Sequence, residues 1–151
     1  MKFALAACAL VLLATACGQG SGNGADENVT KLGDVEVTAK LVDVGGEFPP
    51  NDLYDYAHVM KYEVLETHRG AVDGTTIYVA HYNPRKPRTT VADERSGEIG
   101  GNVTRFVVGS VHRMALVSPI DDHYMGPQVN KVPGSENSIV YWALWTNRTS
   151  Q

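Results

Sequence analysis

The chain has 151 residues, which is enough for one domain and short for two. Charged residues make up 20% of it and apolar residues 43%, a composition that fits a globular protein and excludes a disordered one. Acidic residues outnumber basic residues 17 to 13, and such a chain gains nothing from displacing phosphate counterions, which excludes nucleic acid as an expected partner. The one long apolar run, residues 3–14, is shorter than the about 20 residues that a bilayer span needs.

The N-terminus has the order of a secretory signal peptide. Lys2 carries a positive charge, residues 3–13 are apolar, and small residues follow at positions 14–16. We therefore assign residues 1–16 to a signal peptide and exclude them from the reasoning about the fold. Cleavage after Ala16 leaves Cys17 as the first residue of the mature chain.

The stretch "LATAC" that ends at Cys17 resembles the lipobox of bacterial lipoproteins. The resemblance implies a diacylglyceryl group on the Cys17 thiol, cleavage by signal peptidase II, and a place in the bacterial cell envelope. In a Gram-negative organism Gly18 implies sorting to the outer membrane, on its periplasmic face. Two alternatives stay open. One is a lipobox "LAAC" ending at Cys8 after a short apolar run, and the other is an ordinary signal peptide that leaves Cys17 free.

Residues 17–32 are predicted to form a flexible glycine-rich tether. The stretch "GQGSGNGADEN" alternates glycine with small polar residues and cannot bury apolar surface. The segment from Cys17 to Asn28 has an average reach of roughly 20 Å. The membrane is therefore an expected partner, through the lipid on Cys17. No cysteine remains for a disulfide, so residues 33–151 are expected to fold as a single domain on their own core.

Alternation of apolar and polar residues, together with β-branched and aromatic residues, predicts strands along the whole domain. An Asp73-Gly74 turn signal joins the second and third strands as a hairpin, and Gly109 marks a bulge. The long stretch 83–102 has no clear period and is predicted to be a loop. The predicted strands are residues 34–44, 56–68, 75–82, 103–108, 111–117 and 139–146.

This pattern predicts an all-β fold, a small antiparallel barrel of five to six strands, with a β-sandwich as the alternative. The stretch "YEVLETHRG…GTTIYVAHY" is similar to a strand pair of bacterial OB-like and netrin-module-like domains. That resemblance implies a helix between the third and fourth strands, for which residues 89–98 offer room for a short one. Protease inhibition in the manner of netrin-like modules ranks last. The inhibitors of that family use a free N-terminal cysteine amine and disulfides, and this chain would lack both.

His58, His81 and His112 lie on three separate predicted strands, each on a face shared with apolar residues. If those strands are neighbours, the imidazoles could converge on a metal such as zinc. A metal-binding protein or a metal-dependent enzyme is therefore the alternative function. The opposing interpretation is that each of the three histidines is an ordinary residue with hydrogen-bond partners. No cofactor other than a metal is expected.

No catalytic residue is predicted. Ser110 and His112 stand two apart, about 7 Å along a straight strand, without a G-x-S-x-G elbow. Asp121 and Asp122 offer oxygen ligands for calcium but lack the EF-hand spacing, and we interpret them as a solvated turn. The basic stretch "NPRKPR", residues 83–88, is interpreted as a solvated loop rather than a polyanion site.

Both faces of the last predicted strand are apolar, although a strand of a simple barrel should have one wet face. Either the 83–102 loop covers the outer face, or a partner does. Trp142 and Trp145, with Tyr54 and Tyr56, form the candidate partner surface, since Trp and Tyr are enriched at interfaces. The sequence thus predicts a non-enzymatic envelope lipoprotein that binds a protein, peptide or glycan partner.

Overall fold

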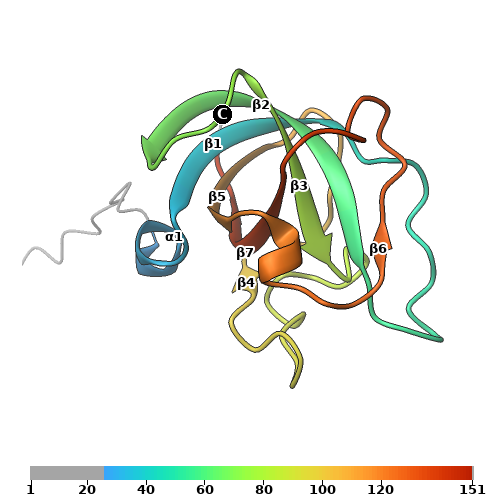
Figure 1. The fold of residues 1–151 in the computed structure, drawn as a ribbon. Coiled ribbons are helices and arrows are strands. Elements are labelled where there is room, and N and C mark those ends of the chain that lie inside the picture. The colour runs from blue at the N-terminus through green and yellow to red at the C-terminus, as the bar shows by residue number, and fades with distance from the viewer. Residues whose placement is uncertain (1–25, 151) are drawn as a thin grey trace, which may run out of the picture.

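The structure is a computed structural model and describes residues 26–150, so the predicted signal peptide, Cys17 and most of the tether lie outside the described residues. None of the helices in the described part has the length and hydropathy to cross a membrane. The elements in chain order are α1 (Glu27–Lys31), β1 (Val35–Asp43), β2 (Ala57–Arg69), β3 (Thr76–Tyr82), β4 (Gly100–Gly101), β5 (Val111–Val117), the 3₁₀-helix η1 (Ile120–Asp122), β6 (Gln128–Val129) and β7 (Val140–Arg148) (Figure 1). The all-β class is confirmed.

The strands form one mixed seven-stranded sheet in the order β1-β5-β7-β3-β2-β6, with β4 paired to β7. β1 also pairs with β2, so the pairings of five strands lead from β1 back to β1. The predicted hairpin of β2 and β3 is confirmed by their antiparallel ladder. The β3–β7 pairing is parallel, so the expectation of a purely antiparallel sheet is wrong. The described residues hold no second sheet of a sandwich.

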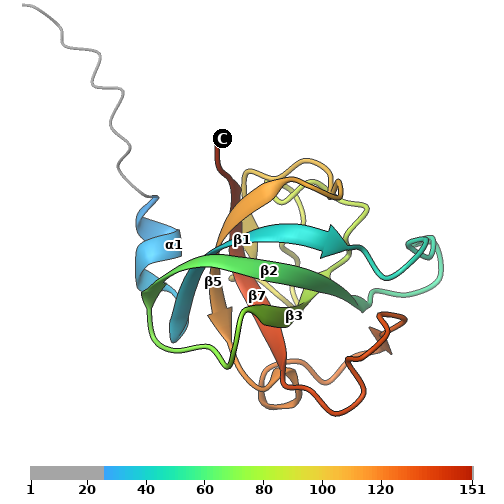
Figure 2. The same cartoon turned by 90° about the horizontal axis from the view of Figure 1, so that it is seen from above.

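β2 is long enough to change partners along its length. Residues 57–63 pair with β3, whereas residues 61–69 pair with β1. Three register shifts on the β1–β2 ladder bend the pair, because each extra residue in a ladder increases the local twist. Figure 2 shows β1 and β2 running side by side across β5 and β7.

The core lies on the inner face of this sheet, where the alternation of β1 buries Val37, Ala39 and Leu41 completely. A second apolar cluster lies on the outer face and contains Trp142 and Leu144 of β7. The loop residues Val91 and Ile99 belong to that outer cluster. Of the two alternatives for the outer face of the last strand, the structure therefore shows the first, in which the 83–102 loop packs against it.

Two local predictions are wrong. Residues 103–108 form no strand, because Val103 gives its carbonyl to the amide of Arg88 in the neighbouring loop rather than to a strand partner. Residues 89–98 form turns rather than a helix, since the Asp93 side chain accepts from the amides of Arg95 and Ser96.

The short helix lies instead at α1, inside the segment predicted as tether. Asp26 caps α1, because its side chain accepts from the amide of Asn28. α1 contacts β5 and β7, so residues 26–32 belong to the folded part of the chain.

Candidate functional site

Two of the three predicted histidines meet in the interior around one tyrosine hydroxyl. Tyr62 of β2 places its Oη 3.1 Å from Nε2 of His81 on β3 and 3.1 Å from Nδ1 of His112 on β5. All three side chains are buried. Burial lowers the pKa of His81 well below its usual value and that of His112 to about 4, with nearby arginines adding to both effects. Both imidazoles are therefore neutral at pH 7.

His58 takes no part in this arrangement. It lies opposite His81 in the β2–β3 register, but its Nε2 is 2.8 Å from the carbonyl of Val44, and the ring of Phe48 packs edge-on against it. Within residues 26–150, no three His, Cys, Asp or Glu side chains come together as metal ligands. The three histidines thus do not form the metal site that the sequence suggested.

A serine extends the buried histidine pair toward the surface. Ser110 Oγ lies 3.1 Å from Nε2 of His112, although the strand spacing predicted that the two would be too far apart to act together. The reason is local: β5 begins only at Val111, and Ser110 closes a turn with Val107, whose carbonyl accepts from the Ser110 amide. The turn directs the hydroxyl back toward the imidazole.

The chain Ser110–His112–Tyr62–His81 has a preferred direction. The Ser110 hydroxyl donates to the Val107 carbonyl at 2.5 Å, so His112 Nε2 donates to Ser110 Oγ. His112 Nδ1 then accepts from Tyr62, and His81 Nε2 donates to Tyr62 Oη. Among the ring nitrogens of this hydrogen-bond chain, Nδ1 of His81 alone has no partner. In this direction that nitrogen is an acceptor. The opposite direction would bury an unpaired N–H donor, which is the costlier defect, and we therefore assign both imidazoles as Nε2–H tautomers.

This direction does not prepare Ser110 for nucleophilic attack. A catalytic serine gives its proton to the imidazole, whereas here the imidazole donates to the serine. The nearest amides are also occupied: Ser110 N donates to Val107 O and Gly109 N donates to Leu41 O. Neither of these N–H groups is free to stabilise an oxyanion.

A cavity of about 1040 Å³ opens above Ser110 and His112. Polar side chains dominate its lining, and no aspartate or glutamate belongs to it. Its two charged residues, Arg105 and Arg148, take part in no ion pair among residues 26–150. The lining residues are Asn102, Val103, Thr104, Arg105, Val107, Gly109, Ser110, Val111, His112, Arg148, Thr149 and Ser150.

The start of the described chain lies beside this cavity. Asp26 accepts hydrogen bonds from Nε1 of Trp145 at 2.8 Å and from Nδ2 of Asn147 at 3.1 Å. Asn147 in turn accepts from the amide of Asn102, and Asn102 accepts from the amide of Arg148. Asp26, the cap of α1, is thus joined through two asparagines to the wall of the cavity.

The interior carries a further cation, Arg88, which the sequence placed in a solvated loop. Its guanidinium is buried over the ring of Phe106 at 5.3 Å, and it donates to the carbonyls of Asn83 and Lys86. No carboxylate pairs with it within the described range. Burial lowers its pKa to about 10, so the group stays charged at pH 7.

The predicted aromatic partner surface does not form. Trp142 is 2% exposed and stacks on Tyr124 with ring centres 4.7 Å apart, and Tyr56 is fully buried. Trp145 is half-buried over Gly100 and is bonded to Asp26. Only Tyr54 is exposed, at 46%. Most of these rings therefore lie in the interior of the molecule and not on its surface.

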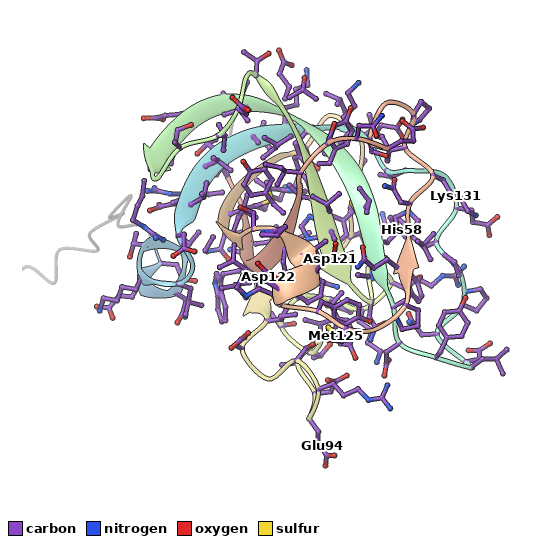
Figure 3. The ribbon with its side chains drawn as sticks, in the orientation of Figure 1. His58, Glu94, Asp121, Asp122, Met125 and Lys131 are labelled. Carbon is purple, nitrogen blue, oxygen red and sulfur yellow. The ribbon has the colours of Figure 1, made fainter. Side chains whose placement is uncertain are left out.

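The acidic pair at η1 is also isolated. Figure 3 shows Asp121 and Asp122 at η1, while Glu94 points away from the body of the molecule. Asp121 accepts from the side chain of Gln128 at 3.0 Å. Within residues 26–150, Asp121 and Asp122 belong to no cluster of three or more His, Cys, Asp or Glu side chains.

Sequence reasoning missed Tyr62, Arg105 and Arg148. Tyr62 carried a weak signal, because it shares the inward face of its strand with His58 and Met60. Arg148 lies beyond the predicted end of the last strand, and nothing local marks it. Comparison with known proteins finds no matching family model, no matching curated protein and no matching solved structure.

Proposed function

We propose that the protein is a lipid-anchored, non-catalytic module of the bacterial envelope that binds its ligand in the cavity above Ser110 and His112. The observation that carries this proposal is the cavity itself. It is large and polar, its lining contains no carboxylate, and its two arginines have no ion pair within residues 26–150 of a chain that is acidic as a whole. Such a lining favours a polar ligand with negative charge.

The proposed architecture is an OB-like barrel. In support, five strands pair in the cyclic order β1-β2-β3-β7-β5, and β3 and β7 are parallel. On this interpretation the cavity lies at one mouth of the barrel, and mouths of small barrels are frequent ligand sites. A barrel mouth is shared by many small barrels of different function, whereas the charges of this lining belong to this chain.

The non-catalytic part of the proposal is supported by the direction of the hydrogen-bond chain. Ser110 accepts from His112 and donates to Val107, and the adjacent amides are used in backbone bonds. A bound ligand therefore meets a serine that is held in place rather than activated. The buried pair of histidines stabilises the floor of the site and supplies no free base.

The anchor is supported by the sequence "LATAC" and by the position of Asp26. Only the segment between Cys17 and Asp26 separates the proposed lipid from the wall of the cavity. This location is the envelope, and in a Gram-negative organism the periplasmic face of the outer membrane. Mass spectrometry of native protein tests it: we expect a diacylglyceryl mass on Cys17, its loss in Cys17→Ser, and its retention in Cys8→Ser. An unmodified Cys17 thiol would contradict the anchor.

The binding site is tested with a matched pair of threonine-to-tryptophan variants, one at each of two cavities. Thr104 is exposed and lines the proposed site, whereas Thr76 is exposed and lines a second cavity of about 600 Å³. The wild type is screened against a panel of envelope peptides, glycans and phospholipids. We expect a ligand whose binding Thr104→Trp abolishes and Thr76→Trp preserves. Turnover of that ligand, or binding that Thr104→Trp leaves unchanged, would contradict the proposed function.

A further inference from the structure

We propose that the ligand of this cavity is the phosphate headgroup of an anionic phospholipid, in the membrane to which Cys17 tethers the chain. The inference rests on the proposed function and narrows it to one class of ligand. It is carried by three features that meet at the cavity: two arginines without an ion pair among residues 26–150, an exposed apolar turn, and Asp26, where the tether ends.

The charged side chains that line the cavity favour a bound anion. Arg105 and Arg148 are both exposed at its lining, and neither has a carboxylate partner in the part of the chain that the structure describes. Arg148 also acts on the buried His112, whose pKa burial lowers first and this cation lowers further. Asp26, which lies beside Asn147, already accepts from Trp145 and Asn147. A phosphate between the arginines would supply the missing negative charge.

An apolar turn projects beside the arginines. Val107 and Val108 are 53% and 56% exposed, and both precede Gly109, whose φ of 92° lets the turn close onto Ser110. Val42 is also exposed and lies beside them, because Gly109 N donates to Leu41 O. Apolar side chains next to cations match the boundary between acyl chains and headgroups of a bilayer.

The tether makes a membrane the nearest source of phosphate. The chain enters the domain at Asp26, which is bonded to Asn147, the residue before Arg148. Only residues 18–25 stand between Cys17 and Asp26 in the sequence, so a lipid anchor on Cys17 would hold the cavity close to the bilayer surface. Burial of the valines and attraction of the arginines then act in the same direction.

A sugar is the weaker candidate for this cavity. Its lining contains no Phe, Tyr or Trp, so a sugar ring finds no aromatic face on which to stack. The exposed valines would also remain in water beside a bound glycan. Both features are explained when the ligand is a headgroup in a membrane.

Vesicle binding tests the inference on the mature chain with Cys17→Ser, which removes the anchor but keeps the domain. The probes are vesicles of phosphatidylcholine with and without phosphatidylglycerol, and soluble glycerol phosphate. We expect binding only with phosphatidylglycerol, weakened about fivefold by Arg105→Gln or Arg148→Gln and roughly 25-fold by both. Arg95→Gln is the matched control, because Arg95 is exposed, lies outside the cavity and also has no ion pair within residues 26–150.

The apolar turn has its own control. Val108→Asn should weaken vesicle binding severalfold, whereas Ile139→Asn, at a residue with the same 56% exposure on another surface, should not. Equal binding to both kinds of vesicle, or an equal loss with Arg95→Gln, would overturn the inference. So would glycerol phosphate that binds as tightly as the vesicles, since free phosphate would then suffice. If a glycan or peptide binds in a manner sensitive to Thr104→Trp while phosphatidylglycerol does not, the inference fails and the proposed function stands.

Discussion

Tyr62 shows how much a single buried hydroxyl can organise. Its Oη is 3.1 Å from one nitrogen of His81 and 3.1 Å from one nitrogen of His112, and among residues 26–150 the only other partner of these two rings is Ser110, beside Nε2 of His112. Tyr62→Phe removes the hydroxyl and leaves both imidazoles short of a hydrogen bond. We expect the free energy of unfolding to fall by about 1–3 kcal/mol, measured by urea denaturation.

The control for this substitution is Tyr78→Phe. Tyr78 is also largely buried, but its hydroxyl makes none of the side-chain hydrogen bonds found among residues 26–150. Its loss should change stability by less than about 0.5 kcal/mol. Equal effects of the two substitutions would show that the bridge between the histidines adds nothing to stability.

Arg88 and Arg85 lie three residues apart in one loop and have opposite surroundings. Arg88 is buried and donates to two carbonyls, whereas Arg85 is exposed, donates to the carbonyl of Phe48 at the surface and lies 3.9 Å from Glu47. Arg88→Ala should lower the free energy of unfolding by roughly 3 kcal/mol, because it removes the hydrogen bonds to two carbonyls and the packing over Phe106. Arg85→Ala should change it by less than about 0.5 kcal/mol, as surface pairs usually do. Thermal unfolding of both variants measures these losses of stability. Similar losses in the two variants would contradict the structural role of Arg88.

At the scale of elements, the end of β7 departs from simple alternation. Ala115 pairs with Trp145 and Leu116 with Ala143, so Leu144 is an extra residue in the ladder. This bulge takes Trp145 off the inward face, on which alternation had placed it with Tyr141 and Ala143. The indole then packs against the backbone of β4, where only a glycine leaves room.

Gly100→Ala tests this packing. A methyl carbon at Gly100 would lie 2.6 Å from Cη2 of Trp145, well inside van der Waals contact. We expect a loss of about 1–3 kcal/mol in the free energy of unfolding, as overpacking typically produces. Gly97→Ala is the control, since its methyl would lie 3.5 Å from Asp93 O, an ordinary contact. A stability equal to that of Gly97→Ala would mean that Trp145 moves aside freely.

At the scale of the whole molecule, buried histidines set the acid limit of stability. Burial lowers the pKa of His112 to about 4 in the folded protein, against about 6.5 in the unfolded chain. Between these values the unfolded state binds more protons, so stability falls as the pH is lowered from about 6.5 to about 4. His112 alone accounts for up to about 3 kcal/mol, and His81, whose pKa burial also lowers, adds to the same trend.

The measurement is the free energy of unfolding as a function of pH. The slope between pH 6.5 and 4 should be smaller for His112→Gln than for the wild type, whatever the stability of the variant at pH 7. His123→Gln, at an exposed residue, should keep the wild-type slope. If His112→Gln also keeps it, the imidazole is not neutral in the folded protein.

Local pattern sufficed wherever an element is shaped by its own residues. The alternation of β1, the β-branched run of β2 and β3, and the turn signal at Asp73-Gly74 all predicted what the structure contains. The predictions were wrong where a residue far along the chain supplies the hydrogen-bond partner. Residues 103–108 look like a strand, but Arg88 takes the carbonyl of Val103, and no local signal reveals that competition.

The candidate site was harder to foresee than the fold. Three histidines stood out in the sequence, but the choice between a metal site and a hydrogen-bonded pair depended on Tyr62 and on the partner of His58. The cavity depends on a turn, on the last residues of β7 and on the segment after β4, which lie far apart along the chain. Aromatic residues suggested a surface, yet most of them fill the core, because burying a large ring stabilises a small domain more than exposing it does.

The sequence by itself determined that the chain is rich in β-structure, that most of its strands lie where they do, and that both faces of its last strand are apolar. These properties follow from the order of apolar and polar residues within single segments. Only the tertiary structure decided that two histidines share one hydroxyl, that Arg88 is buried while Arg105 and Arg148 line a cavity, and that Asp26 lies beside that cavity. The physical reason is that hydrogen bonds and burial at these positions come from residues far away in the chain, and their register is set only when the sheet closes its pairings.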